Sequence, residues 1–291
     1  MKKILLTTAA MLLSFNVYAK EAPKPEEITE NGNLRLNVRR VALDVSSTEV
    51  KNSDQYQNSP VSELSANSET IIRGAVDVAL EYEKTQYRWD QRLTMSYGRT
   101  KTRPINAPNV TNENADEILF TSEYTQKMWK YEDADVGPFG SLGYQTEFTE
   151  NNGSPRQKIV RGRSGIRLFN GKYFSNLSIA AVGESDMTHN PQNEKLAGEI
   201  AAEAKYPLRE GVEFKFEGYY RNYVSYSRYE PTDLEYDLNA TGRMDVKLVG
   251  NLSLSPFVSY RLAEARGADS AGSNFTTGIS LTYSDLFDIF K

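Results

Sequence analysis

Apolar residues occupy every second position in two consecutive segments near residues 70–97, and this alternation restricts the fold more than any other feature. The alternating positions are Ile72, Gly74, Val76, Val78, Leu80 and Tyr82 in the first segment, and Tyr87, Trp89, Leu93, Met95 and Tyr97 in the second. A period of two predicts β-strands, because successive side chains leave a strand on opposite faces. Each run continues for about ten residues, which is the length that a tilted strand needs to cross a bilayer. The two segments therefore predict a transmembrane β-hairpin.

The same alternation recurs along the chain and predicts about twelve strands, an even number as bacterial single-chain barrels require. The expected fold class is all-β, a transmembrane antiparallel up-and-down β-barrel. The remaining strands are expected near Leu34–Val45, Glu117–Lys130, Phe139–Thr149, Gln157–Phe169, Tyr173–Ala181, Leu196–Tyr206, Val212–Val224, Leu234–Leu248, Leu252–Tyr260 and Phe275–Tyr283. In the first of these the alternation changes parity at Arg39 and Arg40, which predicts a β-bulge.

The N-terminal segment has the pattern of a secretory signal peptide. Lys2 and Lys3 precede an apolar stretch from Ile4 to Phe15, and Val17-Tyr18-Ala19 offers small residues at the positions that a signal peptidase recognises. The apolar stretch is shorter than the roughly 20 residues of a membrane-spanning helix, which disfavours an N-terminal anchor. We expect a signal peptide at 1–19, a periplasmic leader at 20–30 and an outer-membrane barrel at 31–291.

The expected connections alternate between tight and long, as they do in outer-membrane barrels. Tight turns are expected at Glu83–Gln86, Asn170–Lys172, Leu208–Gly211 and Val249–Asn251, and long polar loops at Ser46–Ser68, Thr100–Ala115, Glu184–Glu194 and Ala263–Ser273. One expected turn, Tyr131–Gly137, is longer than the others. A water-soluble β-sandwich has no need for this alternation, so both termini are expected on the periplasmic side of an outer membrane.

Composition agrees with a barrel whose outer face alone is apolar. Hydrophobic residues make up 39% of the chain, and there are 18 Tyr, 1 His and no Cys. The absence of Cys excludes a disulfide framework. The formal charge of -5 arises from interleaved acids and bases, which gives no support for nucleic-acid binding.

Aromatic residues gather near both ends of the expected strands, as in the interfacial girdles of membrane barrels. The expected girdle residues are Tyr82, Tyr87, Trp89, Tyr97, Tyr206, Tyr236, Tyr260 and Tyr283. Trp129 departs from this pattern, because its parity in the strand points inward unless that strand contains a β-bulge. The regular alternation ends near Tyr283, with Phe290 as the penultimate residue.

Charged residues concentrate at the positions whose parity points into the lumen. Basic candidates are Arg88, Arg92, Arg161, Arg163 and Arg167, and acidic candidates are Glu199, Glu203, Glu213, Glu217, Glu235, Asp237 and Asp245. Their strands predict one basic and one acidic wall. The walls could line a water-filled pore and orient small polar solutes, or they could interlock as ion pairs in a closed scaffold.

These features resemble the Gram-negative outer-membrane β-barrel class over essentially the whole expected mature chain. The segment Trp129–Phe148 followed by the Arg-rich Gln157–Arg167 resembles uncharacterised salt-induced outer-membrane proteins, and the Arg-rich strand is similar to small oligosaccharide porins. The resemblance implies a small porin or channel for polar or oligosaccharide solutes. Expected partners are outer-membrane lipid, the barrel-assembly machinery and small polar solutes.

Two other function classes stay open, a non-conducting structural or adhesion barrel and a lipid-active enzyme. No convincing catalytic constellation is present, because the single histidine, His189, falls in an expected loop and Gly162-Arg163-Ser164-Gly165 lies on a strand without a following helix. The acidic segment Glu132-Asp133-Ala134-Asp135 has too few ligands for a calcium site. We therefore expect no catalytic residues, no metal and no cofactor.

Overall fold

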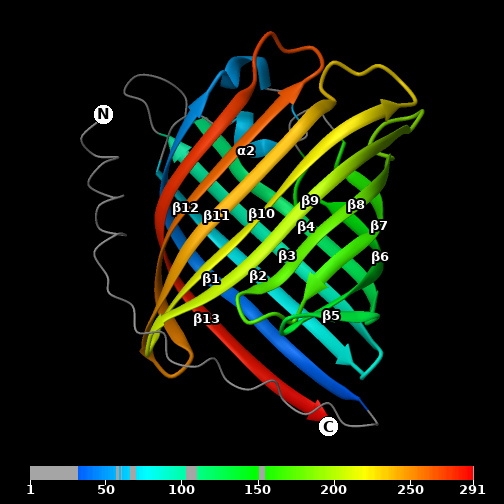
Figure 1. The fold of residues 1–291 in the computed structure, drawn as a ribbon. Coiled ribbons are helices and arrows are strands. Elements are labelled where there is room, and N and C mark those ends of the chain that lie inside the picture. Colours follow the sequence, from blue (N-terminus) through cyan, green and yellow to red (C-terminus); the bar gives the residue numbers. More distant parts are fainter. Residues whose placement is uncertain are drawn as a thin grey trace.

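The computed structural model describes residues 32–56, 59, 61–65, 70–102, 110–150 and 155–290. These residues form a closed barrel of long tilted antiparallel strands (Figure 1). The strands are β1 (Asn33–Lys51), β2 (Thr70–Glu83), β3 (Tyr87–Thr102), β4 (Val110–Gln126), β5 (Trp129–Tyr131), β6 (Ala134–Thr146), β7 (Lys158–Phe169), β8 (Phe174–Asp186), β9 (Asn193–Arg209), β10 (Val212–Tyr226), β11 (Leu234–Val249), β12 (Leu252–Ala265) and β13 (Gly272–Phe290).

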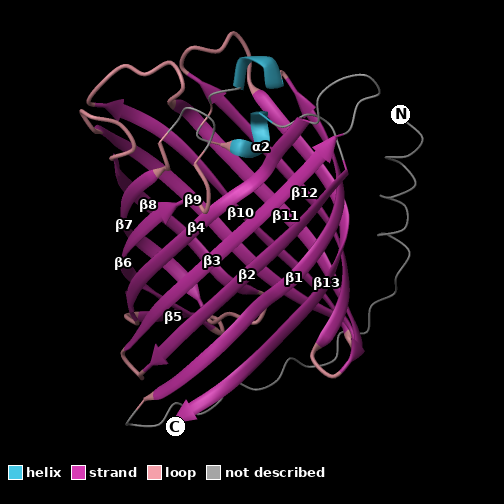
Figure 2. Cartoon of the chain, turned by 180° about the vertical axis from the view of Figure 1, so that it is seen from behind, coloured by secondary structure: helices cyan, strands magenta, loops and turns pink. Residues whose placement is uncertain are grey.

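Strand order follows the chain, and β1 pairs with β13 to close the sheet. Apart from the three-residue β5, twelve strands make the wall, with β4 pairing directly with β6. The predicted all-β antiparallel up-and-down barrel is therefore confirmed. The short helical segments η1 (Ser53–Tyr56) and α2 (Ser62–Ser65) lie at one end (Figure 2). Within the described residues no helix is long and apolar enough to cross a membrane.

The two ends of the barrel differ in their connections. Short connections join β2 to β3, β7 to β8, β9 to β10 and β11 to β12 at the end where β13 finishes, which we call the turn end. Longer connections, including the segment with α2, lie at the opposite loop end. The loops are shorter than predicted because strands such as β1 and β8 continue beyond their expected limits.

The barrel wall is apolar outside and polar inside. Large hydrophobic side chains face outward around the wall, among them Ile166, Ile179 at 61% exposure and Ile200 at 53% exposure. Neighbouring inward positions carry small or charged residues, such as Ala180 and Glu199. An apolar outer band suits lipid, and a closed sheet leaves no unpaired backbone along the wall, so the barrel is of the outer-membrane type.

The predicted bulge in β1 is confirmed. The register of β1 against both neighbours shifts between Val38 and Val41, beside Arg39 and Arg40. The extra residue changes which parity points inward. Before the bulge Arg35, Asn37 and Arg39 face the lumen, whereas after it the inward positions are Ala42, Asp44 and Ser46.

The strand break between β4 and β5 explains the exposed position of Trp129. Trp129 pairs with Val136 on the outer face and is 49% exposed, so uninterrupted alternation, which points it inward, does not hold in this strand. The parity changes at Lys127 and Met128, where β4 ends. Gly137 lies against this break, and a Cβ there would be 1.7 Å from the carbonyl oxygen of Gln126. The expected turn Tyr131–Gly137 is therefore a narrow β5–β6 hairpin.

The last strand continues well beyond the end of its regular alternation at Tyr283. Residues Asp285 to Phe290 pair with β1, and the ring of Phe290 lies 6.3 Å from that of Tyr82. The interruption in the pattern comes from the polar residues Ser284, Asp285 and Asp288, while the pairing is maintained. The predicted signal peptide and leader lie outside the described residues.

The outer face can be tested with a charge at mid-strand. Ile200→Arg should lower the free energy of unfolding in lipid by about 2 to 4 kcal/mol, because the guanidinium would meet hydrocarbon at the centre of the bilayer. Val224→Arg, two residues before the end of β10, is the control and should cost less. Equal effects of the two substitutions on urea unfolding would contradict the assignment of the lipid-facing band.

Candidate functional site: the charged lumen

A single cavity of about 1810 Å³ occupies the inside of the barrel. Its lining extends from Asn33 and Ser284 at the turn end to Val61 and Glu63 at the loop end. Ten of the predicted luminal residues line it, namely Arg88, Arg92, Arg161, Arg163, Arg167, Glu199, Glu203, Glu213, Glu217 and Asp237.

The two remaining predicted residues do not line the cavity. The register between β11 and β12 shifts between Leu234 and Tyr236, so Leu234 points inward and Glu235 lies exposed on the other face. Asp245 lies buried behind the lining, with Lys215 at 2.9 Å and Arg243 at 2.8 Å. Glu235 therefore departs from the predicted luminal set because of a second irregularity, one that alternation alone did not reveal.

The charges are interleaved, which contradicts the prediction of one basic and one acidic wall. Acids that the prediction omitted lie among the basic candidates, and arginines that it omitted lie among the acidic ones. The added acids are Asp77, Glu81, Glu83, Asp90 and Glu123, and the added arginines are Arg221, Arg243 and Arg261. All have the inward parity of their strands, and that parity was the signal that could have found them.

A central ion-pair cluster of Arg39, Asp77, Arg92 and Glu203 crosses the lumen. Arg39 lies 2.5 Å and Arg92 3.1 Å from the Glu203 carboxylate, and Arg92 also donates two hydrogen bonds of 2.8 Å to Asp77. Four strands separate β9, which carries Glu203, from β1 on one side and from β3 on the other. The cluster therefore connects opposite walls and narrows the lumen near mid-barrel.

A second set of ion pairs follows the wall from β4 to β10. Arg163 bridges Glu123 and Glu199 at 3.0 Å each, and Arg167 also pairs with Glu123. Glu199 receives Arg221 from the neighbouring strand at 2.5 Å. These side chains are all at least partly buried, where water solvates a charge poorly. Each charge is stabilised there by a nearby charge of opposite sign.

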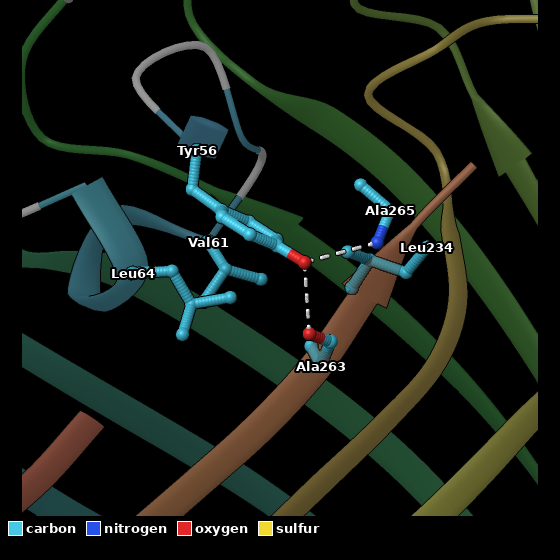
Figure 3. Packing of buried hydrophobic residues seen from close by; sticks show 6 residues of the cluster. All are labelled: Tyr56, Val61, Leu64, Leu234, Ala263 and Ala265. Carbon is cyan, nitrogen blue, oxygen red and sulfur yellow. Dashed lines mark hydrogen bonds between the residues drawn. The ribbon is translucent and has the colours of Figure 1, made fainter. Parts of the chain in front are cut away.

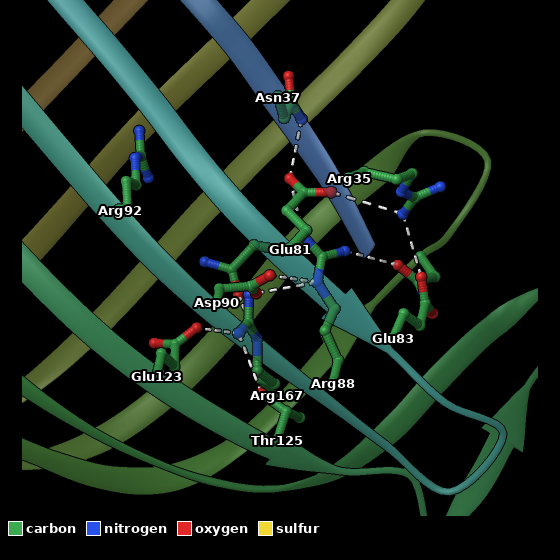
Figure 4. Close-up of polar contacts among 12 residues, drawn as sticks. Arg35, Asn37, Glu81, Glu83, Arg88, Asp90, Arg92, Glu123, Thr125 and Arg167 are labelled. Atoms are coloured by element: carbon green, nitrogen blue, oxygen red, sulfur yellow. Dashed lines mark hydrogen bonds and ion pairs between the residues drawn. The ribbon is translucent and has the colours of Figure 1, made fainter. Parts of the chain in front are cut away.

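At the turn end, arginine and glutamate side chains of β1, β2 and β3 form a connected network (Figure 4). Arg35 lies 3.1 Å from Glu83, and Arg88 contacts Glu81 at 3.1 Å and Asp90 at 2.8 Å. Asn170, in the β7–β8 turn, donates to Glu83 at 2.7 Å and accepts from Arg88 at 3.1 Å. This end of the barrel is thus narrowed by contacts that reach from the β7–β8 turn to β2 and β3.

At the loop end, the segment between β1 and β2 folds inward as a loop-end cap made of Tyr56, Val61, Glu63 and Leu64. Leu64 is 0% exposed and packs with Tyr56 and Val61 against Leu234, Ala263 and Ala265 (Figure 3). The Tyr56 hydroxyl lies 3.1 Å from the Ala263 carbonyl oxygen, and Glu63 lies 3.2 Å from Arg261 in the lumen. This cap was not predicted, since the sequence of residues 46–68 is hydrophilic and has no periodic pattern.

Below the cap, an aromatic residue takes part in the luminal network. The Tyr219 hydroxyl donates to Asp237 at 2.7 Å and accepts from Arg261 at 3.3 Å, while the Arg221 guanidinium lies 5.1 Å from the Tyr219 ring. The sequence analysis does not predict this role for Tyr219, because it assigns the aromatic residues other than Trp129 to the lipid face.

Most of the expected girdle residues lie near the ends of their strands, while Tyr283, seven residues before the end of β13, pairs with Leu252 at the start of β12. Trp89, Tyr260 and Tyr283 are exposed, and the others are partly covered by neighbouring rings. Aromatic contacts near the turn end are Tyr82 with Tyr87 and Tyr173 with Tyr206, and contacts near the loop end are Tyr97 with Phe148 and Tyr220 with Tyr236.

Groups that were considered for catalysis or metal binding do not converge. His189 is exposed in the β8–β9 loop, while Ser164 is exposed on the outer face of β7. In the acidic segment, Asp133 accepts a hydrogen bond from the Lys172 amide and Asp135 lies 3.6 Å from Lys127. Across the described ranges no group of three or more His, Cys, Asp or Glu residues is arranged to hold a metal ion.

Comparison with known proteins gives one partial family match. Residues 62–151, less than half of the chain, match a family described as a protein of unknown function, DUF3078. No curated protein matches.

Solved structures with similar folds include the COG4313 outer membrane channel from Pseudomonas putida F1, at 9% identity and a TM-score of 0.49, covering 91% of this chain and 100% of that one. The outer membrane channel DcaP of Acinetobacter baumannii matches at 9% identity and a TM-score of 0.42, covering 89% and 99%. The translocator domain of the autotransporter NalP from Neisseria meningitidis matches at 9% identity and 0.34, covering 97% and 95%.

The loop-end cap can be tested by Leu64→Asp. A carboxylate in the apolar cluster would be buried without a partner, at a cost of several kcal/mol, so the segment should leave the mouth and single-channel conductance should rise. Asp54→Asn, at an exposed position of η1, is the control and should leave the conductance unchanged. An unaltered conductance in Leu64→Asp would mean that the cap does not restrict the mouth.

Proposed function

We propose that this protein is an outer-membrane channel for small polar solutes, with an ion-paired lumen. The observation that carries the proposal is the single cavity whose lining extends from the turn end to the loop end. Ligand pockets typically have volumes of about 300 to 1,000 Å³, and this cavity is larger than that range. At about 30 Å³ for each water, it has room for several tens of water molecules.

The ion pairs favour a narrow channel over a wide diffusion pore. The central ion-pair cluster places two guanidinium groups and two carboxylates across the lumen at one level. A solute must pass beside this cluster, and the polar lining can exchange hydrogen bonds with it along the way. Compact polar molecules, including short oligosaccharides, fit this description.

A closed scaffold, which uses the same ion pairs to fill the lumen, is the alternative. It is disfavoured because small inward residues such as Ser141, Gly143 and Thr241 line the cavity and leave space between the paired charges. A lipid-active enzyme is disfavoured by the separation of His189, in a loop, from Ser164, on the outer face. As a barrel of this class, the protein would contact outer-membrane lipid and depend on the assembly machinery for insertion.

Conductance in a planar bilayer tests the proposal. Purified protein should form discrete, low-conductance channels, and Arg39→Ser should increase the conductance because it shortens a side chain of the central cluster while Glu203 keeps Arg92. Arg73→Ser is the matched control. Its guanidinium pairs with Asp44 on the neighbouring strand at 2.9 Å and does not line the cavity, so the same loss of charge should leave the conductance unchanged.

If the purified protein is folded, as judged by a heat-dependent shift in its gel mobility, and yet forms no channels, the proposal is contradicted and the closed scaffold is favoured. Equal conductance in the wild type and Arg39→Ser would show instead that the narrowest point lies elsewhere in the lumen.

A further inference from the structure

Every arginine that lines the cavity forms an ion pair, and some share a carboxylate, as Arg163 and Arg167 share Glu123. Each of these guanidinium groups lies within 4.0 Å of a carboxylate in the described part of the chain, and Lys195 and Lys215 are paired as well. Lys130, Lys172 and Lys205 also line the cavity, but they are exposed near the turn end, where water and salt screen their charges.

Most carboxylates of the lining are balanced in one of two ways. The majority pair with a cation, while Asp116, Asp133 and Asp285 accept hydrogen bonds from backbone amides near the ends of the barrel. Among the described residues, Glu117 and Glu217 have neither a cation within 4.0 Å nor such an amide. Glu117, on β4, accepts only a hydrogen bond of 3.3 Å from the neutral Gln145.

The position of Glu217, on β10, relates it directly to the narrow part of the lumen. It is exposed to the cavity and lies opposite Glu203 on β9. Glu203 belongs to the central ion-pair cluster, in which two arginines balance two carboxylates. Glu217 therefore adds, at that level, a carboxylate that forms no ion pair within 4.0 Å among the described residues, although the charges of Arg92 and Arg40 also act on it. Thr241 lies directly opposite it on β11, and the inward residues that flank Thr241 are Asn239 and Arg243, of which Arg243 is paired with Asp245.

A purely structural role gives little reason for this arrangement. Two glutamates directly opposite one another on antiparallel strands repel each other and destabilise the sheet. Glu203 is compensated by ion pairs with Arg39 and Arg92, whereas Glu217 is not. A carboxylate without an ion pair in the narrow part of a water-filled lumen acts instead on the ions that pass beside it.

We propose that Glu217 and Glu117 determine specificity and make the channel prefer cations, so that its solutes include inorganic cations and small polar molecules with an ammonium group. This inference rests on the proposed channel function. Glu117 attracts a cation in the part of the lumen nearer the loop end. Glu217 lowers the electrostatic energy of that cation as it passes the arginines of the central ion-pair cluster.

Reversal potentials in a gradient of KCl across a planar bilayer test the inference. The wild type should prefer K⁺ over Cl⁻. A unit charge about 6 Å from a permeant ion in water changes its occupancy by about threefold, so Glu217→Gln should lower the K⁺ to Cl⁻ permeability ratio by about that factor. Glu117→Gln should lower it independently, and Glu217→Lys should favour Cl⁻.

Glu235→Gln is the matched control, because Glu235 is exposed and does not line the cavity. It removes the same charge and should leave the reversal potential unchanged. A conducting wild type whose selectivity is unaffected by Glu217→Gln and by Glu117→Gln would overturn this inference alone. A folded wild type without conductance would overturn the proposed function and this inference with it.

Discussion

Pairing between guanidinium and carboxylate groups inside the barrel is the interaction on which the rest of the structure depends. The outer face is apolar and meets lipid, so the barrel has no hydrophobic core along its axis. The charges that replace such a core are mostly partly buried, and pairing offsets the free-energy cost of removing them from bulk water. Contacts such as Arg163 with Glu123 and Glu199 provide this pairing and also connect β7 with β4 and β9, each of which is separated from it by one strand.

The ion pairs are arranged in levels along the axis. A network of Arg35, Glu81, Glu83, Arg88 and Asp90 lies at the turn end, the central ion-pair cluster crosses the middle, and the loop-end cap meets Arg261 at the other end. A lumen organised in this way can hold water between the levels. It can also distinguish solutes by charge, since a few carboxylates without ion pairs among many paired charges dominate the local potential.

Strand alternation predicted the barrel well, because lipid on one side and water on the other impose opposite requirements on successive residues. It placed Arg163 and Glu199 inward and even located the bulge at Arg39 and Arg40. It failed for Glu235 and Trp129, where a shift in register and a strand break changed the parity. Such irregularities depend on close backbone contacts, as at Gly137. They change the alternation of apolar and polar residues in the sequence very little.

The prediction of separate basic and acidic walls was wrong because it used only some of the inward charges. Asp77, Glu123 and Arg221 have the same inward parity and place both signs of charge on each side of the barrel. Another feature depends on three-dimensional closure and could not be predicted from single strands. The inward fold of Tyr56 and Leu64 depends on the space left at the mouth by small residues such as Ala263. The sequence of a hydrophilic loop has no local pattern that would predict the space at the mouth of the barrel into which it folds.

The central claim is that the middle of the lumen is open to water, and cysteine accessibility tests it most directly because the chain contains no native Cys. Thr241 lies in the cavity lining beside Glu217, while the adjacent Ala240 faces lipid. A charged, membrane-impermeant thiol reagent should modify the folded Thr241→Cys variant and reduce its conductance, and should leave the Ala240→Cys variant unmodified. Protection of the introduced thiol in both variants would contradict an open lumen.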